Sequence, residues 1–159
     1  MKRTCVGLAV MVLIVAGVVA GQTRLERKHV TLNRSEDMSA LPFSEGVLAG
    51  NTLYVAGTIG LDATGKPPAS AEEEARLAME GVKKVVESQG MTMDDIVSVQ
   101  VFCTDLSLYD TFNKVYRTYF HAPFPARAFV GVASLLRGGH FEVMATAVRQ
   151  GGLRNVRAK

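Results

Sequence analysis

The stretch PFPARAFVGVASLLRGGHFEVMATAV, from Pro123 to Val148, decides the fold of this chain. It contains two segments in which apolar side chains alternate along the chain, and a short glycine-containing connection joins them. A period of two is typical of a β-strand with one buried face. In the second segment it places Phe141, Val143, Ala145 and Ala147 on one face and His140, Glu142, Met144 and Thr146 on the other. We therefore expect two strands here.

Each of these two segments contains one strongly ionised side chain, Arg127 in the first and Glu142 in the second. An ionised group in an apolar strand is unfavourable unless it is paired or meets a ligand. Two interpretations stay open: an Arg127–Glu142 ion pair at a strand end or subunit interface, or a ligand site. A guanidinium is planar, permanently charged and able to bind a carboxylate through two parallel hydrogen bonds. Arg127 is therefore a candidate receptor for a small acid.

The residues before this stretch first predict a hairpin and then a helix. Gly50-Asn51 separates two apolar runs within residues 47–59, and both residues tolerate the positive φ of a tight hairpin turn. Ser70 and Glu73 match a capping box, and Gly90 ends the helix. The apolar stripe of this helix is Ala75, Ala78, Met79, Val82, Val85 and Val86. We expect the glutamates Glu72, Glu73, Glu74 and Glu87 to lie on a solvated face.

A further strand and helix complete the pattern. Residues 94–104 alternate as a strand through Val97, Val99, Val101 and Cys103. Ser107 with Asp110 predicts the cap of a second helix, whose stripe is Leu108, Phe112, Val115, Tyr116 and Tyr119. The order is β-β-α-β-α-β-β, with an additional strand expected around residues 29–32. Two helices can cover one face of a single sheet, so the other face would stay apolar and exposed unless the chain oligomerises.

The ends of the chain differ from its body. Residues 1–20 combine a basic start with the uncharged apolar run CVGLAVMVLIVAGVVA, which predicts a signal peptide and export to the periplasm or the medium. A membrane anchor is the alternative, although the run is shorter than the roughly 20 residues that span a bilayer. We expect an N-terminal extension over residues 21–40, one domain over residues 41–150 and a flexible basic tail over residues 151–159.

Composition argues against several classes of site. The net charge of +3 comes largely from the ends, and no basic stripe with interleaved aromatics indicates nucleic-acid binding. Cys103 continues a strand alternation, so we expect a buried, unreactive thiol and no disulfide after signal cleavage. The three histidines do not group with cysteines or carboxylates as metal ligands do, so no metal site is expected.

The segments PARAFVGV and HFEVMATAVR resemble the signature of the Rid family, the YjgF-like enamine/imine deaminases. The resemblance continues through LPFSEGVLAGNTLYVAGTIGLDATGK, GVKKVVESQGMTMDDIVSVQVFCTDL and FNKVYRTYF, in family order, over roughly residues 41–150. It implies the chorismate-mutase-like α+β fold, a single mixed sheet with two helices on one face. It also implies a homotrimer whose clefts lie between subunits.

The resemblance also implies roles for single positions. Arg127 matches the arginine that grips the substrate carboxylate, and Glu142 matches the glutamate associated with the reacting water. The remaining matched positions are Asn113 and Gly57 near the cleft and Phe129, which would contribute only its backbone where many members have cysteine.

Three other positions depart from the pattern of the deaminating members. Phe43 replaces the usual tyrosine, Ala56 replaces the serine before the glycine, and Thr58 replaces a glutamine.

The implied reaction is hydrolysis of a 2-imino acid, or its enamine tautomer, to a 2-oxo acid and ammonia, and it calls for no metal or organic cofactor. The protein would then be a hydrolase of the 2-iminobutanoate/2-iminopropanoate deaminase type acting on a small carboxylate. The alternative is a non-catalytic protein of the same fold that uses Arg127 to bind a small carboxylate. The departures at Phe43 and Ala56 and the predicted export favour this alternative, whereas the Arg127 and Glu142 pair favours the enzyme.

Overall fold

The two segments between Pro123 and Val148 form strands β5 (Ala126–Gly131) and β6 (Phe141–Val148) of one six-stranded sheet. The computed structural model describes residues 26–32 and 42–150. The other strands are β1 (Arg27–Val30), β2 (Gly46–Ala49), β3 (Thr52–Ile59) and β4 (Ile96–Cys103). Their order across the sheet is β1-β2-β3-β6-β4-β5. Strands β4 and β5 pair in parallel and the other neighbours pair antiparallel, so the sheet is mixed, as expected.

Strand β6 lies between β3 and β4, and its alternation is confirmed. Its residues from Phe141 to Ala147 alternate between buried and more exposed positions. In β4 the predicted alternation holds from Val99 to Cys103 but is wrong at Val97, which is exposed. The register of β4 against β6 shifts between Ile96 and Ser98, so Val97 is an extra residue that leaves the buried face.

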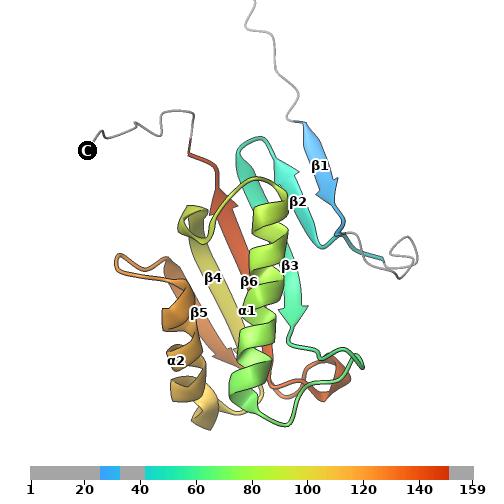
Figure 1. Cartoon of the computed structure of the whole chain (residues 1–159), viewed down its shortest axis with the longest axis vertical. Helices are drawn as coiled ribbons and strands as arrows, with labels where there is room; N and C mark the ends of the chain where they lie inside the picture. The colour runs from blue at the N-terminus through green and yellow to red at the C-terminus, as the bar shows by residue number, and fades with distance from the viewer. Residues whose placement is uncertain (1–25, 33–41, 151–159) are drawn as a thin grey trace, which may run out of the picture.

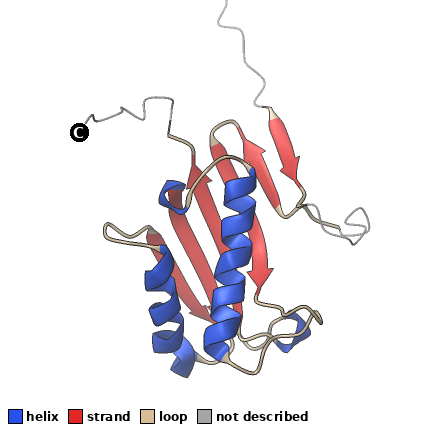
Figure 2. Cartoon of the chain, in the orientation of Figure 1, coloured by secondary structure: helices blue, strands red, loops and turns tan. Residues whose placement is uncertain are grey.

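The helices α1 (Ala71–Ser88) and α2 (Tyr109–Tyr119) both cover the same face of the sheet, which confirms the predicted layers (Figure 1). Figure 2 shows the two helices side by side in front of the strands. All six residues of the predicted α1 stripe are buried, and so are Phe112, Val115 and Tyr116 of α2. They pack with the inward residues of β3, β4 and β6 as one hydrophobic core. The fold is therefore the α+β architecture that the residue pattern predicts.

The caps of the helices agree with the sequence only in part. The Ser70 hydroxyl accepts the Glu73 N–H at 3.4 Å, but the Glu73 side chain pairs with Arg76, so the reciprocal half of the capping box is not formed. Ser107 does not cap the second helix. A short 3-10 turn, Leu106–Leu108, precedes α2, and Asp105 caps that turn by accepting the Ser107 N–H at 2.9 Å.

The N-terminal strand and the turn of the predicted hairpin are present. Strand β1 pairs antiparallel with β2 and begins two residues before the expected range of 29–32. Gly50 takes a φ of 60° at the turn between β2 and β3. The predicted signal peptide, most of residues 21–40 and the tail 151–159 lie outside the described residues. In the described part, neither helix has the length and apolar character needed to cross a bilayer.

Candidate functional site

Arg127 lies near the start of β5 and on the face of the sheet that the helices cover. It pairs with the buried Val99 of β4, and paired residues of neighbouring strands point to the same side. Its guanidinium carbon is 4.6 Å from the centre of the Tyr116 ring, 5.6 Å from that of Tyr109 and 5.7 Å from that of Phe129. Nη2 donates to the Tyr109 hydroxyl at 3.3 Å.

These rings hold the cation without neutralising it. A cation–π contact stabilises a guanidinium by about 0.5–1 kcal/mol at an exposed site, and it does not remove the positive charge. Within residues 26–32 and 42–150, Arg127 forms no ion pair with any carboxylate. Phe129 contributes more than the backbone that the resemblance implied, because its ring packs edge-on against Tyr109 and Phe112 beside the guanidinium. Arg127 is thus a positioned, unneutralised cation.

A hollow of about 200 Å³ opens beside this cation. It is lined by Asn113, Tyr116, Arg117, Phe124, Pro125 and Arg127. Tyr116 is buried, and its hydroxyl has no hydrogen-bond partner in the described part of the chain. Burial raises the pKa of Tyr116 to about 12, against the opposing effect of Arg127, so the hydroxyl stays protonated near neutral pH. The hollow therefore offers a permanent positive charge and neutral polar groups, which suits a small organic anion.

Glu142 lies on the other face of the sheet. It pairs with Phe102 of β4 and Ile59 of β3. The carboxylate of Glu142 packs against the backbone of Gly57. A Cβ atom built at position 57 would lie 1.8 Å from Oε1 of Glu142. A register shift between Val55 and Thr58 places Gly57 there. The side chain of Glu142 makes no hydrogen bond or ion pair to another described residue.

The two predicted catalytic residues are therefore separated within one chain. Their β4 partners, Val99 and Phe102, are three residues apart, an odd number, so Arg127 and Glu142 point to opposite faces. Three strand residues correspond to roughly 10 Å along the sheet. An Arg127–Glu142 ion pair within one chain is therefore excluded, whereas the same pair at a subunit interface, also left open by the sequence, stays a prediction.

The other predicted positions divide between these two groups. Asn113 joins Arg127 at the hollow, whereas Gly57 contacts Glu142 and Ala56 lies in the same register shift of β3. Phe43 is 55% exposed in the segment before β2 and has no described contact with either group. The structure thus assembles two half-sites, one around Arg127 and one around Glu142.

Thr58, which replaces the glutamine of the resembled pattern, points away from Glu142. It pairs with Val143 on the helix face, and its methyl group packs close to Gly81 of α1. Its hydroxyl donates to the carbonyl of Ala56 at 3.2 Å.

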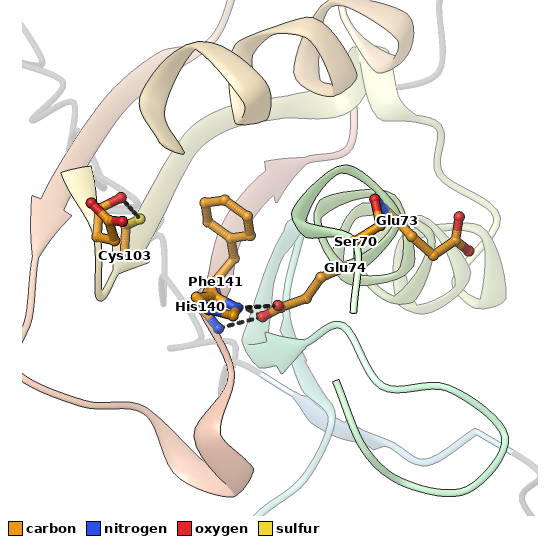
Figure 3. Close-up of polar contacts among 7 residues, drawn as sticks. Ser70, Glu73, Glu74, Cys103, His140 and Phe141 are labelled. Atoms are coloured by element: carbon orange, nitrogen blue, oxygen red, sulfur yellow. Dashed lines mark hydrogen bonds and ion pairs between the residues drawn. The ribbon is translucent and has the colours of Figure 1, made fainter. Parts of the chain in front are cut away.

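Glu74 is a residue that the sequence interpretation placed wrongly. It is completely buried instead of solvated, because it lies on the sheet side of the first turn of α1. Its Oε1 accepts the N–H groups of His140 at 2.5 Å and Phe141 at 2.9 Å, and its Oε2 lies 2.8 Å from Nδ1 of His140 (Figure 3). These contacts attach the start of β6, one residue before Glu142, to α1.

The remaining polar groups have structural roles. Cys103 is buried, as predicted, and its thiol donates to the Asp105 carbonyl at 3.0 Å. Burial raises the pKa of the Cys103 thiol, which disfavours the thiolate that a nucleophile requires. Tyr119 donates its hydroxyl to Glu80 at 2.7 Å, between the two helices. Within the described ranges, no group of three or more histidine, cysteine or acidic side chains is arranged to hold a metal ion.

Sequence reasoning missed Tyr109, Tyr116 and Arg117 as parts of the site. Tyr116 belonged to the predicted apolar stripe and was read as core, which describes its ring but not its hydroxyl. No local sequence pattern indicated that Arg117 belongs to the site, because its contact with the Phe124 ring depends on how the chain turns after α2.

Comparisons with known proteins identify relatives of this chain. The family model described as endoribonuclease L-PSP matches residues 33–149. The 2-iminobutanoate/2-iminopropanoate deaminase of Bos taurus is 36% identical over 110 residues, which cover 68% of this chain and 80% of the bovine protein.

Solved structures match as well. The crystal structure of E. coli TdcF with bound serine is 37% identical, covers 69% of this chain and 89% of its own, and superposes with a TM-score of 0.66. The E. coli YjgF structure is 38% identical at a TM-score of 0.65, with the same shares of the two chains covered.

Proposed function

This chain belongs to the YjgF/Rid family, whose model carries the description endoribonuclease L-PSP, and on that premise we propose that it is a hydrolytic deaminase of reactive 2-imino acids. The products are a 2-oxo acid and ammonia. The observation that carries the proposal is the unneutralised Arg127, fixed among three aromatic rings at the edge of a hollow large enough for a small acid. The names of the relatives support the same class of reaction.

The chemistry follows from the two half-sites. Arg127 binds the substrate carboxylate through two charge-assisted hydrogen bonds. Glu142 accepts a proton from a water molecule, whose oxygen forms a bond to the imino carbon C2. The imino nitrogen receives that proton, which gives a carbinolamine. Glu142 then transfers the hydroxyl proton of the carbinolamine to its amino nitrogen, the C–N bond breaks, and ammonia leaves as the C2 carbonyl forms. One water is consumed for each ammonia released.

We further propose that the half-sites meet between subunits of a homotrimer. Arg127 and Glu142 of one chain point to opposite faces of the sheet, so a single substrate cannot lie between them within that chain. Within the described residues, no helix covers the face that carries Glu142. That face exposes apolar side chains, among them Tyr54, which is 54% exposed, and Met144. Burying that face against other copies of the chain would bring the half-sites of different subunits together.

One observation favours the non-catalytic alternative. The site lacks the hydroxyl groups that tyrosine at Phe43 and serine at Ala56 would provide. Tyr109 and Tyr116 place two hydroxyl groups on the Arg127 side, which suits binding as well as catalysis.

The decisive test is ammonia release from freshly generated 2-iminopropanoate. We expect the wild-type chain to accelerate release, and Arg127→Lys to fail nearly as badly as Arg127→Ala because a lysine cannot reproduce the two-pronged contact. Loss of that contact should lower turnover by roughly thirtyfold to several hundredfold. Binding of propanoate without any ammonia release would establish the non-catalytic alternative instead.

Mixed oligomers test the shared site. Arg127→Ala and Glu142→Gln should each be inactive alone. If each site takes Arg127 from one subunit and Glu142 from another, oligomers reassembled from both variants should recover up to about a quarter of the wild-type activity. Reassembled mixtures that stay inactive would show that both residues act from one chain.

A further inference from the structure

We infer that the substrate of this site carries a second carboxylate, which Arg117 binds. The inference rests on the proposed function, because it names the class of 2-imino acid: a 2-imino dicarboxylate of four or five carbons. The observation behind this inference is that two arginines, Arg117 and Arg127, line one small hollow.

Arg117 is held at the hollow by its surroundings. It lies in the last turn of α2, four residues after Asn113, so the two side chains share a face of the helix. Its guanidinium carbon is 5.4 Å from the centre of the Phe124 ring. Phe124 and Asn113 both line the same hollow. The Phe124 ring thus keeps the Arg117 charge beside the hollow, as Tyr116 does for Arg127.

Neither charge is neutralised by the protein. The six residues that line the hollow include no aspartate or glutamate. In the described part of the chain, Arg117 and Arg127 form no ion pair with any carboxylate. Two like charges that face one small space repel each other, and an anion between them relieves that repulsion. A monocarboxylate neutralises one of these guanidinium groups, whereas a dicarboxylate neutralises both.

The size and polarity of the hollow fit such a ligand. A volume of about 200 Å³ exceeds the ≈30 Å³ share of one liquid water several times over, so it accommodates a short dicarboxylate. Tyr116 and Asn113 add neutral donors to the lining of the hollow. The buried hydroxyl of Tyr116 has no partner among the described residues, so a ligand oxygen would satisfy it at a site where an unsatisfied group is unfavourable.

The reaction is unchanged by the second carboxylate. Water adds to C2 of a 2-imino dicarboxylate, the C–N bond breaks, and the products are a 2-oxo dicarboxylate and ammonia. Arg127 holds the carboxylate next to C2, and Arg117 holds the carboxylate at the far end of the chain. Arg117 therefore determines specificity and takes no part in proton transfer.

The test compares two substrates in four proteins: the wild-type chain, Arg117→Ala, Arg117→Lys and Lys114→Ala. Lys114 is the matched control, because it is an exposed cation on the same helix that does not line the hollow. Ammonia release is measured with 2-iminobutanedioate and 2-iminopropanoate, and binding of the stable acids succinate and propanoate is measured by calorimetry.

We expect the wild-type chain to prefer the dicarboxylates in both assays. The ratio of kcat/KM for 2-iminobutanedioate to that for 2-iminopropanoate should fall about tenfold to a hundredfold in Arg117→Ala, mainly through KM. The same ratio should be unchanged in Lys114→Ala. Arg117→Lys should recover part of the loss, because a lysine restores the charge but not the two-pronged contact.

Two results would overturn the inference while leaving the proposed function intact. One is turnover of 2-iminopropanoate by a wild-type chain that shows no preference for dicarboxylates. The other is an Arg117→Ala variant with an unchanged substrate ratio. If neither substrate releases ammonia, the proposed function fails, and the succinate and propanoate titrations alone decide whether Arg117 binds a second carboxylate.

Discussion

Glu74 should stabilise the protein mainly because its side-chain oxygen accepts hydrogen bonds, and less because its side chain is charged. Glu74 is 0% exposed and accepts the backbone N–H groups of His140 and Phe141. In Glu74→Ala both donors lose their partner, at a cost of about 1–3 kcal/mol each, and the missing side chain leaves a cavity. We therefore expect Glu74→Ala to lower the free energy of unfolding by about 3–5 kcal/mol.

Two further variants separate the causes. Glu74→Gln keeps an oxygen that can accept from both N–H groups, and it removes the cost of burying a charge. We expect it to stay within about 1 kcal/mol of the wild type. His140→Ala removes only the contact of Oε2 with a side chain that is 46% exposed, so it should cost about 1 kcal/mol or less.

The assay is urea unfolding followed by circular dichroism, since the chain contains no tryptophan. The protomer concentration is held fixed, because an oligomer's apparent stability depends on it. An unchanged slope of free energy against urea would show that the variants differ in stability alone. The reasoning is refuted if Glu74→Ala costs less than about 1 kcal/mol, or if Glu74→Gln is as damaging as Glu74→Ala.

Four other predictions concern the Gly57 contact, the pH dependence of stability, the assembly of the chain and the cleavage of its N-terminal segment. Gly57→Ala places a Cβ atom 1.8 Å from Oε1 of Glu142, so the carboxylate must move. Ammonia release should then fall at least about tenfold. Unchanged turnover would contradict a role for this contact in the reaction. Hydrogen bonds from Ser107 hold the pKa of Asp105 below its ordinary value, so its stabilisation is present above about pH 4 and is lost as the pH falls through the folded-state pKa. Melting temperatures of wild type and Asp105→Ala should accordingly differ at pH 7 and converge in acid. Light scattering should give about three times the mass of one chain, and a stable monomer would count against the shared site. Mass spectrometry of the expressed protein should find an N-terminus near Ala20, whereas an intact Met1 in a membrane fraction would favour the anchor.

The departure at Phe43 bears on how such a site recognises its ligand. Phe43 carries no hydroxyl and is largely exposed, so it cannot hydrogen-bond a substrate. The hydroxyl groups of Tyr109 and Tyr116 lie instead on the Arg127 side. Our proposal therefore concentrates the polar recognition of the ligand at the Arg127 end of the site, next to the carboxylate group of the substrate.

The sequence by itself determined the elements of this protein. Strand alternation and helical stripes are local properties of the chain, and the core residues of α1, α2 and β6 followed from them. The isolation of Arg127 and Glu142 in apolar segments was equally visible, because an ionised side chain stands out where its neighbours are apolar.

Only the tertiary structure decided how these residues meet. Strand β4 lies between β5 and β6. Its partners of Arg127 and Glu142 are an odd number of residues apart, so the two side chains point to opposite faces of the sheet. The burial of Glu74 depends on its contacts with His140 and Phe141, which are far away in the sequence. The position of Arg117 beside Phe124 depends on the turn after α2. Local periodicity fixes which side of an element is apolar. Strand order, register shifts and the contacts of single polar groups come from non-local pairing, which no local pattern encodes.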